Sequence, residues 1–131
     1  MMVEGAIVLD SSAILALILG ERGAERLPKR VRADSVVSAV NLAEVQTKLV
    51  RVGHEPEAAW IDALSFVSEV EPFTVEQAKI AGTLVAKTQG LGLSLGDRSC
   101  LALALVLGAS VYTADLVWAN LRVGVRIHVI R

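Results

Sequence analysis

An apolar stretch between two acids, Asp97 and Asp115, constrains the fold of this chain more than any other feature. No residue between Arg98 and Asp115 is charged. A stretch this apolar belongs in a protein core, whereas its two acids belong at its ends, where the backbone reaches the surface. The sequence therefore predicts a buried segment with a carboxylate at each end.

The secondary structure expected within this stretch brings the two acids together. Residues 97–107 are predicted to form a helix roughly 16 Å long, at 1.5 Å per residue, that ends at Gly108. A strand at residues 110–113 then runs back antiparallel to the helix. Asp97 and Asp115 are therefore expected to lie side by side. Two carboxylates that meet at the edge of a core suggest a site for a hard cation.

Strands alternate with helices along the whole chain. Apolar runs bounded by turn residues predict strands at residues 6–9, 35–38, 70–73, 110–113 and 125–130. Helices are predicted at residues 13–19, 24–32, 41–52, 56–68, 75–88, 97–107 and 115–121, with Asn41 as the N-cap of the third. This alternation predicts an α/β fold of three layers, in which a mainly parallel five-stranded sheet carries helices on both faces. Since the chain has 131 residues and no repeat or linker, we expect one domain over residues 1–131.

Composition narrows the cellular setting. The longest uncharged run, residues 99–114, has 16 residues, fewer than the roughly 18–20 that a membrane helix needs. The start of the chain has no basic n-region and no cleavage signal, so we expect a soluble, cytoplasmic protein with no membrane partner. The only cysteine, Cys100, cannot form an internal disulfide and is expected to be a small core residue.

Four acids are expected at one edge of the sheet. Asp10 follows the first strand, Glu44 lies in the helix after the second, Asp115 follows the fourth, and Asp97 heads the helix before it. Four carboxylates in one crevice repel one another unless their pKa values rise or a cation binds. Ligation by oxygen alone favours Mg²⁺ or Mn²⁺, commonly held by carboxylates together with substrate phosphates. The pattern therefore indicates phosphodiester chemistry.

Charge is distributed unevenly although the formal net charge is only −1. Residues 55–76 carry acids and no base. Residues 22–51 are rich in cations, namely Arg22, Arg26, Lys29, Arg30, Arg32, Lys48 and Arg51. These are either two solvated faces, or the basic segment contacts phosphate.

Four short motifs occur in a fixed order along the chain. They are Val8-Leu9-Asp10-Ser11-Ser12-Ala13, Asn41-Leu42-Ala43-Glu44-Val45, Leu93-Ser94-Leu95-Gly96-Asp97-Arg98 followed by Cys100-Leu101-Ala102-Leu103-Ala104, and Val111-Tyr112-Thr113-Ala114-Asp115. Each motif alone is weak, but the four in register span the whole chain. With them the sequence resembles PIN-domain ribonucleases, in particular the VapC-type toxins of toxin–antitoxin pairs.

This resemblance implies a metal-dependent endoribonuclease that uses Mg²⁺ or Mn²⁺. Asp10, Glu44, Asp97 and Asp115 would be its metal-binding catalytic acids. Ser12 would hydrogen-bond within the site, and Thr113 would orient Asp115. Apart from the resemblance, we expect Arg98 either to contact phosphate or to pair with an acid. Many PIN domains carry a further acid shortly after the last one, whereas here Leu116-Val117-Trp118 follows. This departure puts a fully occupied second metal site in doubt.

The resemblance also implies protein partners. A cognate antitoxin would bind the chain, and two copies would form a homodimer. The mean hydropathy of +0.55 is high for a monomer of this length. A helical patch drawn from residues 42–66, to which Trp60, Ile61, Leu64 and Val67 add apolar area, is a reasonable dimer surface.

Other interpretations stay open at the level of sequence. Asp10, Ser11 and Ser12 also suit a simple helix cap, and Asp97 suits an acid that interacts with a helix dipole. The chain could be a binding module of the same fold with a structural cation. It could also be another acidic-site phosphoesterase, although phosphatases often use an Asp-x-Asp nucleophile and Asp10 is followed by two serines.

Overall fold

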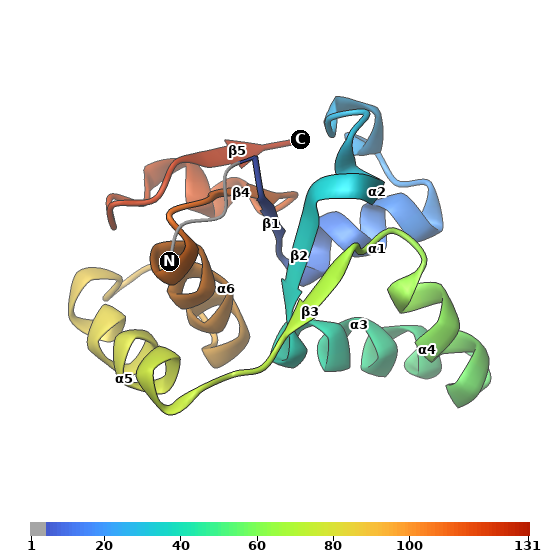
Figure 1. Cartoon of the computed structure of the whole chain (residues 1–131), viewed down its shortest axis with the longest axis horizontal. Coiled ribbons are helices and arrows are strands. Elements are labelled where there is room, and N and C mark those ends of the chain that lie inside the picture. Colours follow the sequence, from blue (N-terminus) through green and yellow to red (C-terminus); the bar gives the residue numbers. More distant parts are fainter. Residues whose placement is uncertain (1–4) are drawn as a thin grey trace.

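The structure of the protein is a computed structural model, described here for residues 5–131, and it contains one five-stranded sheet (Figure 1). The strands are β1 (Ile7–Leu9), β2 (Ser35–Ser38), β3 (Glu69–Glu71), β4 (Ser110–Thr113) and β5 (Ile127–Val129). Their order is β3-β2-β1-β4-β5, and every neighbouring pair is parallel. The prediction of a mainly parallel five-stranded sheet is therefore confirmed.

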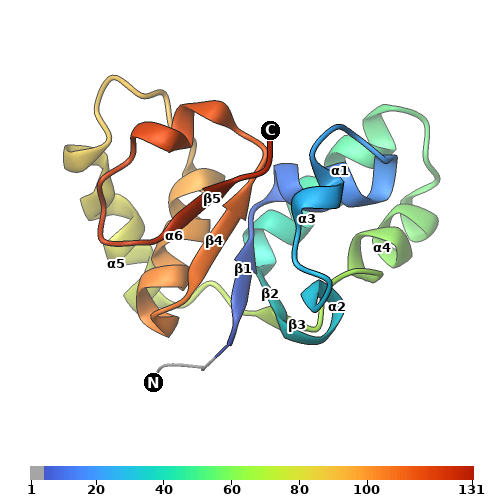
Figure 2. The same ribbon diagram turned by 90° about the horizontal axis from the view of Figure 1, so that it is seen from above.

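Helices cover both faces of the sheet, as a three-layer fold requires. They are α1 (Ser11–Leu19), η1 (Ala24–Arg26), α2 (Val31–Asp34), α3 (Ala39–Arg51), α4 (Pro56–Leu64), α5 (Val75–Thr83), η2 (Leu84–Lys87), α6 (Leu95–Leu107) and η3 (Leu116–Asn120), where η marks a 3₁₀ helix. Helices α1, α3 and α4 lie on one face, and α5 and α6 lie on the other (Figures 1 and 2).

Two hydrophobic cores result, one on each face of the sheet. Within β1, Ile7 and Leu9 pack with α1, α3 and α4. Val8 points the other way and packs with α6 and Trp118. Successive side chains of a strand alternate between faces, so a central strand covered by helices on both sides must be apolar throughout.

The helix–strand return predicted from the apolar stretch is confirmed. Helix α6 ends at Gly108, whose φ of 64° is the left-handed conformation that glycine adopts readily at a helix end. Strand β4 occupies residues 110–113, as predicted, and pairs with the central strand β1. Asp115 therefore returns to the edge at which α6 begins.

Several predicted boundaries were wrong. Residues 24–32 form no continuous helix: η1 ends before Pro28, which lacks a backbone N–H donor. Helix α3 begins at Ala39, because the Ser38 hydroxyl accepts from the Val40 N–H and so acts as N-cap in place of Asn41. Helix α4 stops at Leu64 rather than residue 68. The predicted 75–88 helix is shorter at its end, where it tightens into η2, and the third and fifth strands are also shorter than predicted.

Two remaining expectations concern membrane-spanning helices and the extent of the domain. Within residues 5–131, no helix is both long and apolar enough to span a membrane. The predicted domain began at residue 1, and residues 1–4 lie outside the described part of the chain.

Candidate active site

Asp10 lies between β1 and α1 and is held by three hydrogen bonds. One carboxylate oxygen, Oδ1, accepts from the Ala13 N–H at 2.9 Å and from the Ser12 hydroxyl at 2.8 Å. The other, Oδ2, accepts from the Thr113 hydroxyl at 2.7 Å. Asp10 is therefore both the N-cap of α1 and part of a polar cluster that reaches β4.

The same carboxylate lies in an environment that disfavours its charge. Asp10 is only 3% exposed, and burial raises its pKa from 3.8 to about 6. The three hydrogen bonds lower the pKa and the negative charge of Asp97 raises it, but burial has the largest effect. A cation beside Asp10 would offset part of this cost.

Ser12 and Thr113 connect the end of β1 to the end of β4. The Ser12 hydroxyl accepts from the Ala114 N–H at 2.9 Å while it donates to Asp10. The Thr113 hydroxyl accepts from the Asp115 N–H at 3.0 Å while it donates to Asp10. Thr113 thus contacts the backbone of Asp115 rather than its carboxylate.

Asp97 lies in the first turn of α6, close to two other acids. Its Oδ2 accepts from the Ser94 N–H at 2.9 Å, and the Ser94 hydroxyl accepts from the Asp97 N–H at 3.1 Å. This capping box fixes the start of α6. Burial raises the pKa of Asp97, and the charges of Asp115 and Glu44 raise it further. Asp97 therefore caps a helix and also interacts with the charges of the other acids.

Asp115 directly follows β4 and begins the next helix. Its Oδ1 accepts from the Val117 N–H at 3.0 Å, which makes it the N-cap of η3. Leu116, the next residue, is 63% exposed, while Trp118 is buried in the core. Residues 116–131 contain no Asp or Glu, so Asp115 is the last acid that the sequence places at this edge of the sheet.

Glu44 is positioned by two residues whose importance the sequence did not reveal. The Asn41 amide Nδ2 donates to Glu44 Oε1 at 2.9 Å and to the Gly96 carbonyl at 3.0 Å. A Cβ atom at position 96 would collide with the Glu44 carboxylate. The carboxylate therefore lies directly against the first turn of α6. The signals available in the sequence were an Asn three residues before a Glu on one helix and a Gly next to Asp97.

Arg98 and Cys100 play structural parts in the described conformation. The half-buried Arg98 donates from Nη1 to the Ala81 carbonyl of α5 at 2.8 Å. It makes no ion pair with an acid among residues 5–131, so the predicted acid pairing is not found. Burial raises the pKa of the Cys100 thiol well above its usual range, as expected for a core residue.

The donor atoms of these side chains are of the type that a hard cation prefers. The four acids supply only oxygen donors, and the charges of neighbouring acids contribute to the raised pKa values of Asp10 and Asp97. The Asn41 Oδ1 atom beside Glu44 is buried and has no hydrogen-bond partner within the described chain. No three acidic, His or Cys side chains of residues 5–131 converge closely enough to hold one ion among them. Mg²⁺, however, is usually held by one or two carboxylates, its remaining ligands being waters and substrate phosphate.

Comparison with known proteins points to one family. The model of the PIN domain family matches residues 7–123. No protein of curated function matches the chain significantly by sequence.

Solved structures of similar fold include several toxin–antitoxin proteins. A chain of the DNA-bound VapBC complex from Salmonella typhimurium aligns with a TM-score of 0.76 and 18% identity, over 100% of both chains. A chain of VapBC2 from Rickettsia felis, bound to a promoter DNA fragment, gives 0.71 and 15%, over 94% of this chain and 97% of that one. VapC20 from Mycobacterium tuberculosis, a sarcin-ricin loop cleaving toxin, gives 0.69 and 24%, over 92% and 99%. At these identities the likeness establishes the fold.

Proposed function

Because the chain belongs to the PIN domain family, we propose that it is a metal-dependent endoribonuclease and the toxin of a toxin–antitoxin pair. The observation that carries this proposal is that four carboxylates meet at one edge of the sheet. Thr113 bonds both to Asp10 and to the backbone of Asp115. Glu44 lies against the first turn of α6, which carries Asp97. Carboxylates that repel one another at the ends of parallel strands are suited to hold a cation against a substrate phosphate.

In this proposal one or two of the four acids ligate Mg²⁺ or Mn²⁺ directly and the others act through waters bound to the cation. The neighbouring residues fix the positions of the acids. When bound, the cation polarises the scissile phosphate and lowers the pKa of water. Ser12 and Thr113 orient the Asp10 carboxylate, and Thr113 also fixes the backbone at Asp115. Asn41 holds Glu44 against α6. Hydrolysis then needs no histidine base.

The proposed substrate is RNA, and the proposed protein partner is a cognate antitoxin. One neighbour of the same fold is a sarcin-ricin loop cleaving toxin, and others are toxin–antitoxin complexes. Such a toxin would act in the cytoplasm on single-stranded or looped RNA, which can lie in an open groove. Arg98, now bonded to Ala81, would have to change rotamer to reach a phosphate.

The purified protein, free of its partner, should cut a mixed RNA pool when Mg²⁺ or Mn²⁺ is added and should stop when the cation is chelated. A small phosphomonoester, offered under the same conditions, separates this activity from that of a phosphatase. If the protein hydrolyses the monoester and leaves the RNA uncut, the proposal is contradicted. RNA binding without cleavage in any divalent cation would favour a binding module.

Gly96→Ala should lower RNA cleavage by roughly 10- to 100-fold, because the new methyl group displaces the Glu44 carboxylate. The fold should be retained, since the atoms that must move belong to the end of a flexible side chain. Alanine is also the better helix former, by about 1 kcal/mol in a helix interior. Single-turnover rates and thermal melts of the variant measure the two effects separately.

The matched control is Gly82→Ala in α5, where an added Cβ would have no neighbour within 4 Å. It also replaces a helical glycine by alanine but displaces no acid, so its cleavage rate should equal that of the wild type. If Gly96→Ala also cuts at the wild-type rate, Glu44 does not act from the position described.

We propose that the protein is a homodimer that uses α4 and the adjoining part of α3. Trp60 and Ile61 of α4 are 37% and 60% exposed, as a contact surface would require in the separated chain. Ile61→Arg should therefore give a monomer in light scattering at micromolar concentration, while Val75→Arg on α5 should leave the dimer intact. A monomeric wild-type protein would contradict this assignment.

A further inference from the structure

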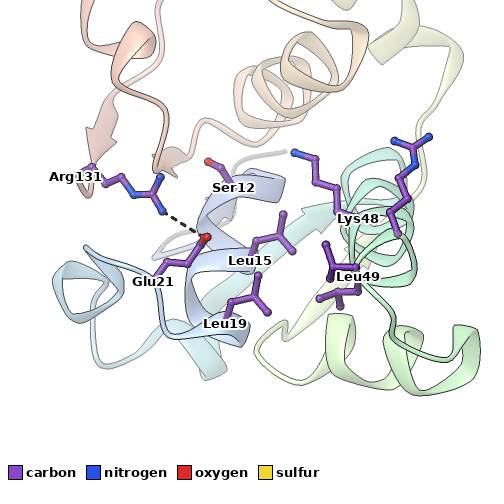
Figure 3. Close-up of a pocket in the computed structure, with 9 residues that line it drawn as sticks. Ser12, Leu15, Leu19, Glu21, Lys48, Leu49 and Arg131 are labelled. Atoms are coloured by element: carbon purple, nitrogen blue, oxygen red, sulfur yellow. Dashed lines mark ion pairs between the residues drawn. The ribbon is translucent and has the colours of Figure 1, made fainter.

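A cavity opens between α1 and α3, next to the acids. It has a volume of about 490 Å³, within the range of roughly 300–1,000 Å³ that is usual for ligand sites. Leu15 and Leu19 of α1 face Leu49 of α3 across it, and Ser12 lies at one end (Figure 3). Because Ser12 donates a hydrogen bond to Asp10, the cavity begins at the candidate active site.

Cationic side chains flank the leucines of this cavity. Lys48, Arg51 and Arg131 line the cavity together with one acid, Glu21. Arg131 is paired with Glu21 at 3.3 Å. Lys48 and Arg51 are exposed and form no ion pair with any residue from 5 to 131. The cavity therefore carries an excess of positive charge.

Lys48 and Arg51 also line a second cavity, which extends along α3. That cavity has a volume of about 460 Å³, and Glu44 is among its lining residues. The two cations thus stand between one cavity that reaches Ser12 and another that reaches Glu44. Their position in the last turn of α3 also suits the helix dipole. That interaction leaves both charges exposed to an anion.

From this arrangement we infer that the Ser12–Arg51 cavity binds one nucleotide of single-stranded RNA next to the scissile phosphate, with its base against the exposed side chains of Leu19 and Val52 and its phosphate on Lys48 and Arg51. The inference rests on the proposed nuclease function and adds the path of the substrate. A nucleotide matches the cavity because the faces of its base are apolar and its phosphate is anionic. Single-stranded RNA exposes both, since its bases are unstacked and can be splayed out.

Binding of a short fluorescein-labelled single-stranded RNA, measured by anisotropy in excess EDTA, tests the inference without cleavage. Each of Lys48→Gln and Arg51→Gln should weaken binding about fivefold at roughly 0.1 M salt and reduce the slope of log K against log salt by about 0.7. Lys79→Gln, an exposed cation on α5, is the matched control and should change neither quantity.

A second pair of variants tests whether the base contacts the apolar side chains of the cavity. Leu19→Gln should weaken binding of the RNA without altering the salt slope, and should leave binding of the same strand without bases unchanged. Val85→Gln, on the opposite side of the sheet, is its control; Leu19 and Val85 are 46% and 44% exposed. This contrast separates contact with a base from contact with the backbone.

The inference is overturned if the wild type does not bind the RNA in EDTA, or if the cavity variants bind it as the controls do. Unchanged RNA binding together with altered self-association in light scattering would assign the cavity to a second copy of the chain. If the wild type binds RNA through Lys48 and Arg51 but never cleaves it, the cavity assignment stands and the proposed nuclease function fails. If the wild type cleaves RNA and the cavity variants bind RNA as the wild type does, only the cavity assignment fails.

Discussion

Removing the charge of Asp97 or Asp115 is expected to lower single-turnover RNA cleavage by at least roughly 10³-fold, a loss of about 4 kcal/mol of transition-state stabilisation. Asp→Asn and Glu→Gln keep the size of the side chain and remove only the charge that holds the cation. Asp10→Asn and Glu44→Gln should have effects of the same order. Ser12→Ala should be milder, because a hydroxyl orients Asp10 without supplying charge.

The four acids should also act as one unit. Once one charge is gone, the cation is no longer held in place, so a double variant such as Asp97→Asn with Asp115→Asn should be barely slower than either single variant. Glu76→Gln, an exposed acid in the first turn of α5, is the control and should retain full activity. Losses that multiply in the double variant would mean that the acids work independently and share no cation.

Asp10→Asn is expected to make the cation-free protein as stable as the wild type or more stable near pH 7. The folded pKa of about 6 lies above the ordinary value of 3.8. The folded protein therefore keeps its proton where the unfolded chain has lost it, and the free energy of unfolding falls as pH rises from about 4 to above 6. That difference in pKa corresponds to roughly 3 kcal/mol.

Asparagine removes this decline and preserves most of the local bonds. It is as good an N-cap as aspartate, so its Oδ1 can still accept from the Ala13 N–H. Its amide can donate to the Thr113 hydroxyl, which has two lone pairs and can also accept from the Asp115 N–H.

Denaturant unfolding at pH 4 and pH 7, without divalent cation, measures the effect as the change in the stability difference between wild type and variant. Mn²⁺ stabilises the protein because it binds only the folded state. It should stabilise the wild type more than the variant, which lacks one of the charges that hold the cation. A clear loss of cation-free stability in Asp10→Asn at pH 7 would show that capping of α1 is the main role of this carboxylate.

Sequence patterns could predict the fold where they depend on neighbours along the chain. The uncharged stretch after Arg98 determined the α6–β4 return, and the alternation of strands and helices determined the layers. Membership of the PIN domain family, expected from the four motifs, is confirmed. The predicted helix over residues 24–32 is interrupted at Pro28. Pro28 is a local signal against a continuous helix, and the prediction gave it too little weight.

The candidate site could be predicted only in part, because some of its contacts join distant positions. Asp97 and Asp115 were expected to meet; burial is the main cause of the raised pKa of Asp97, and the charge of Asp115 raises it further. The contact of Asn41 with Gly96 spans 55 positions, and no local pattern distinguishes a residue that makes it from the helix cap that the sequence predicts at Asn41. The catalytic role of the four acids, and the extent of the domain from residue 1, stay predictions.

Cation binding and RNA cleavage should depend on the same carboxylates, and a Mn²⁺ titration of single-turnover cleavage measures both at once. The wild type should cut a mixed RNA pool at a rate that saturates with Mn²⁺, and Glu76→Gln should follow the same curve. Asp97→Asn and Asp115→Asn should stay at least roughly 10³-fold slower, even at the highest Mn²⁺ concentration that keeps the RNA intact. If both variants cut at the wild-type rate, the acids assigned here do not form the active site.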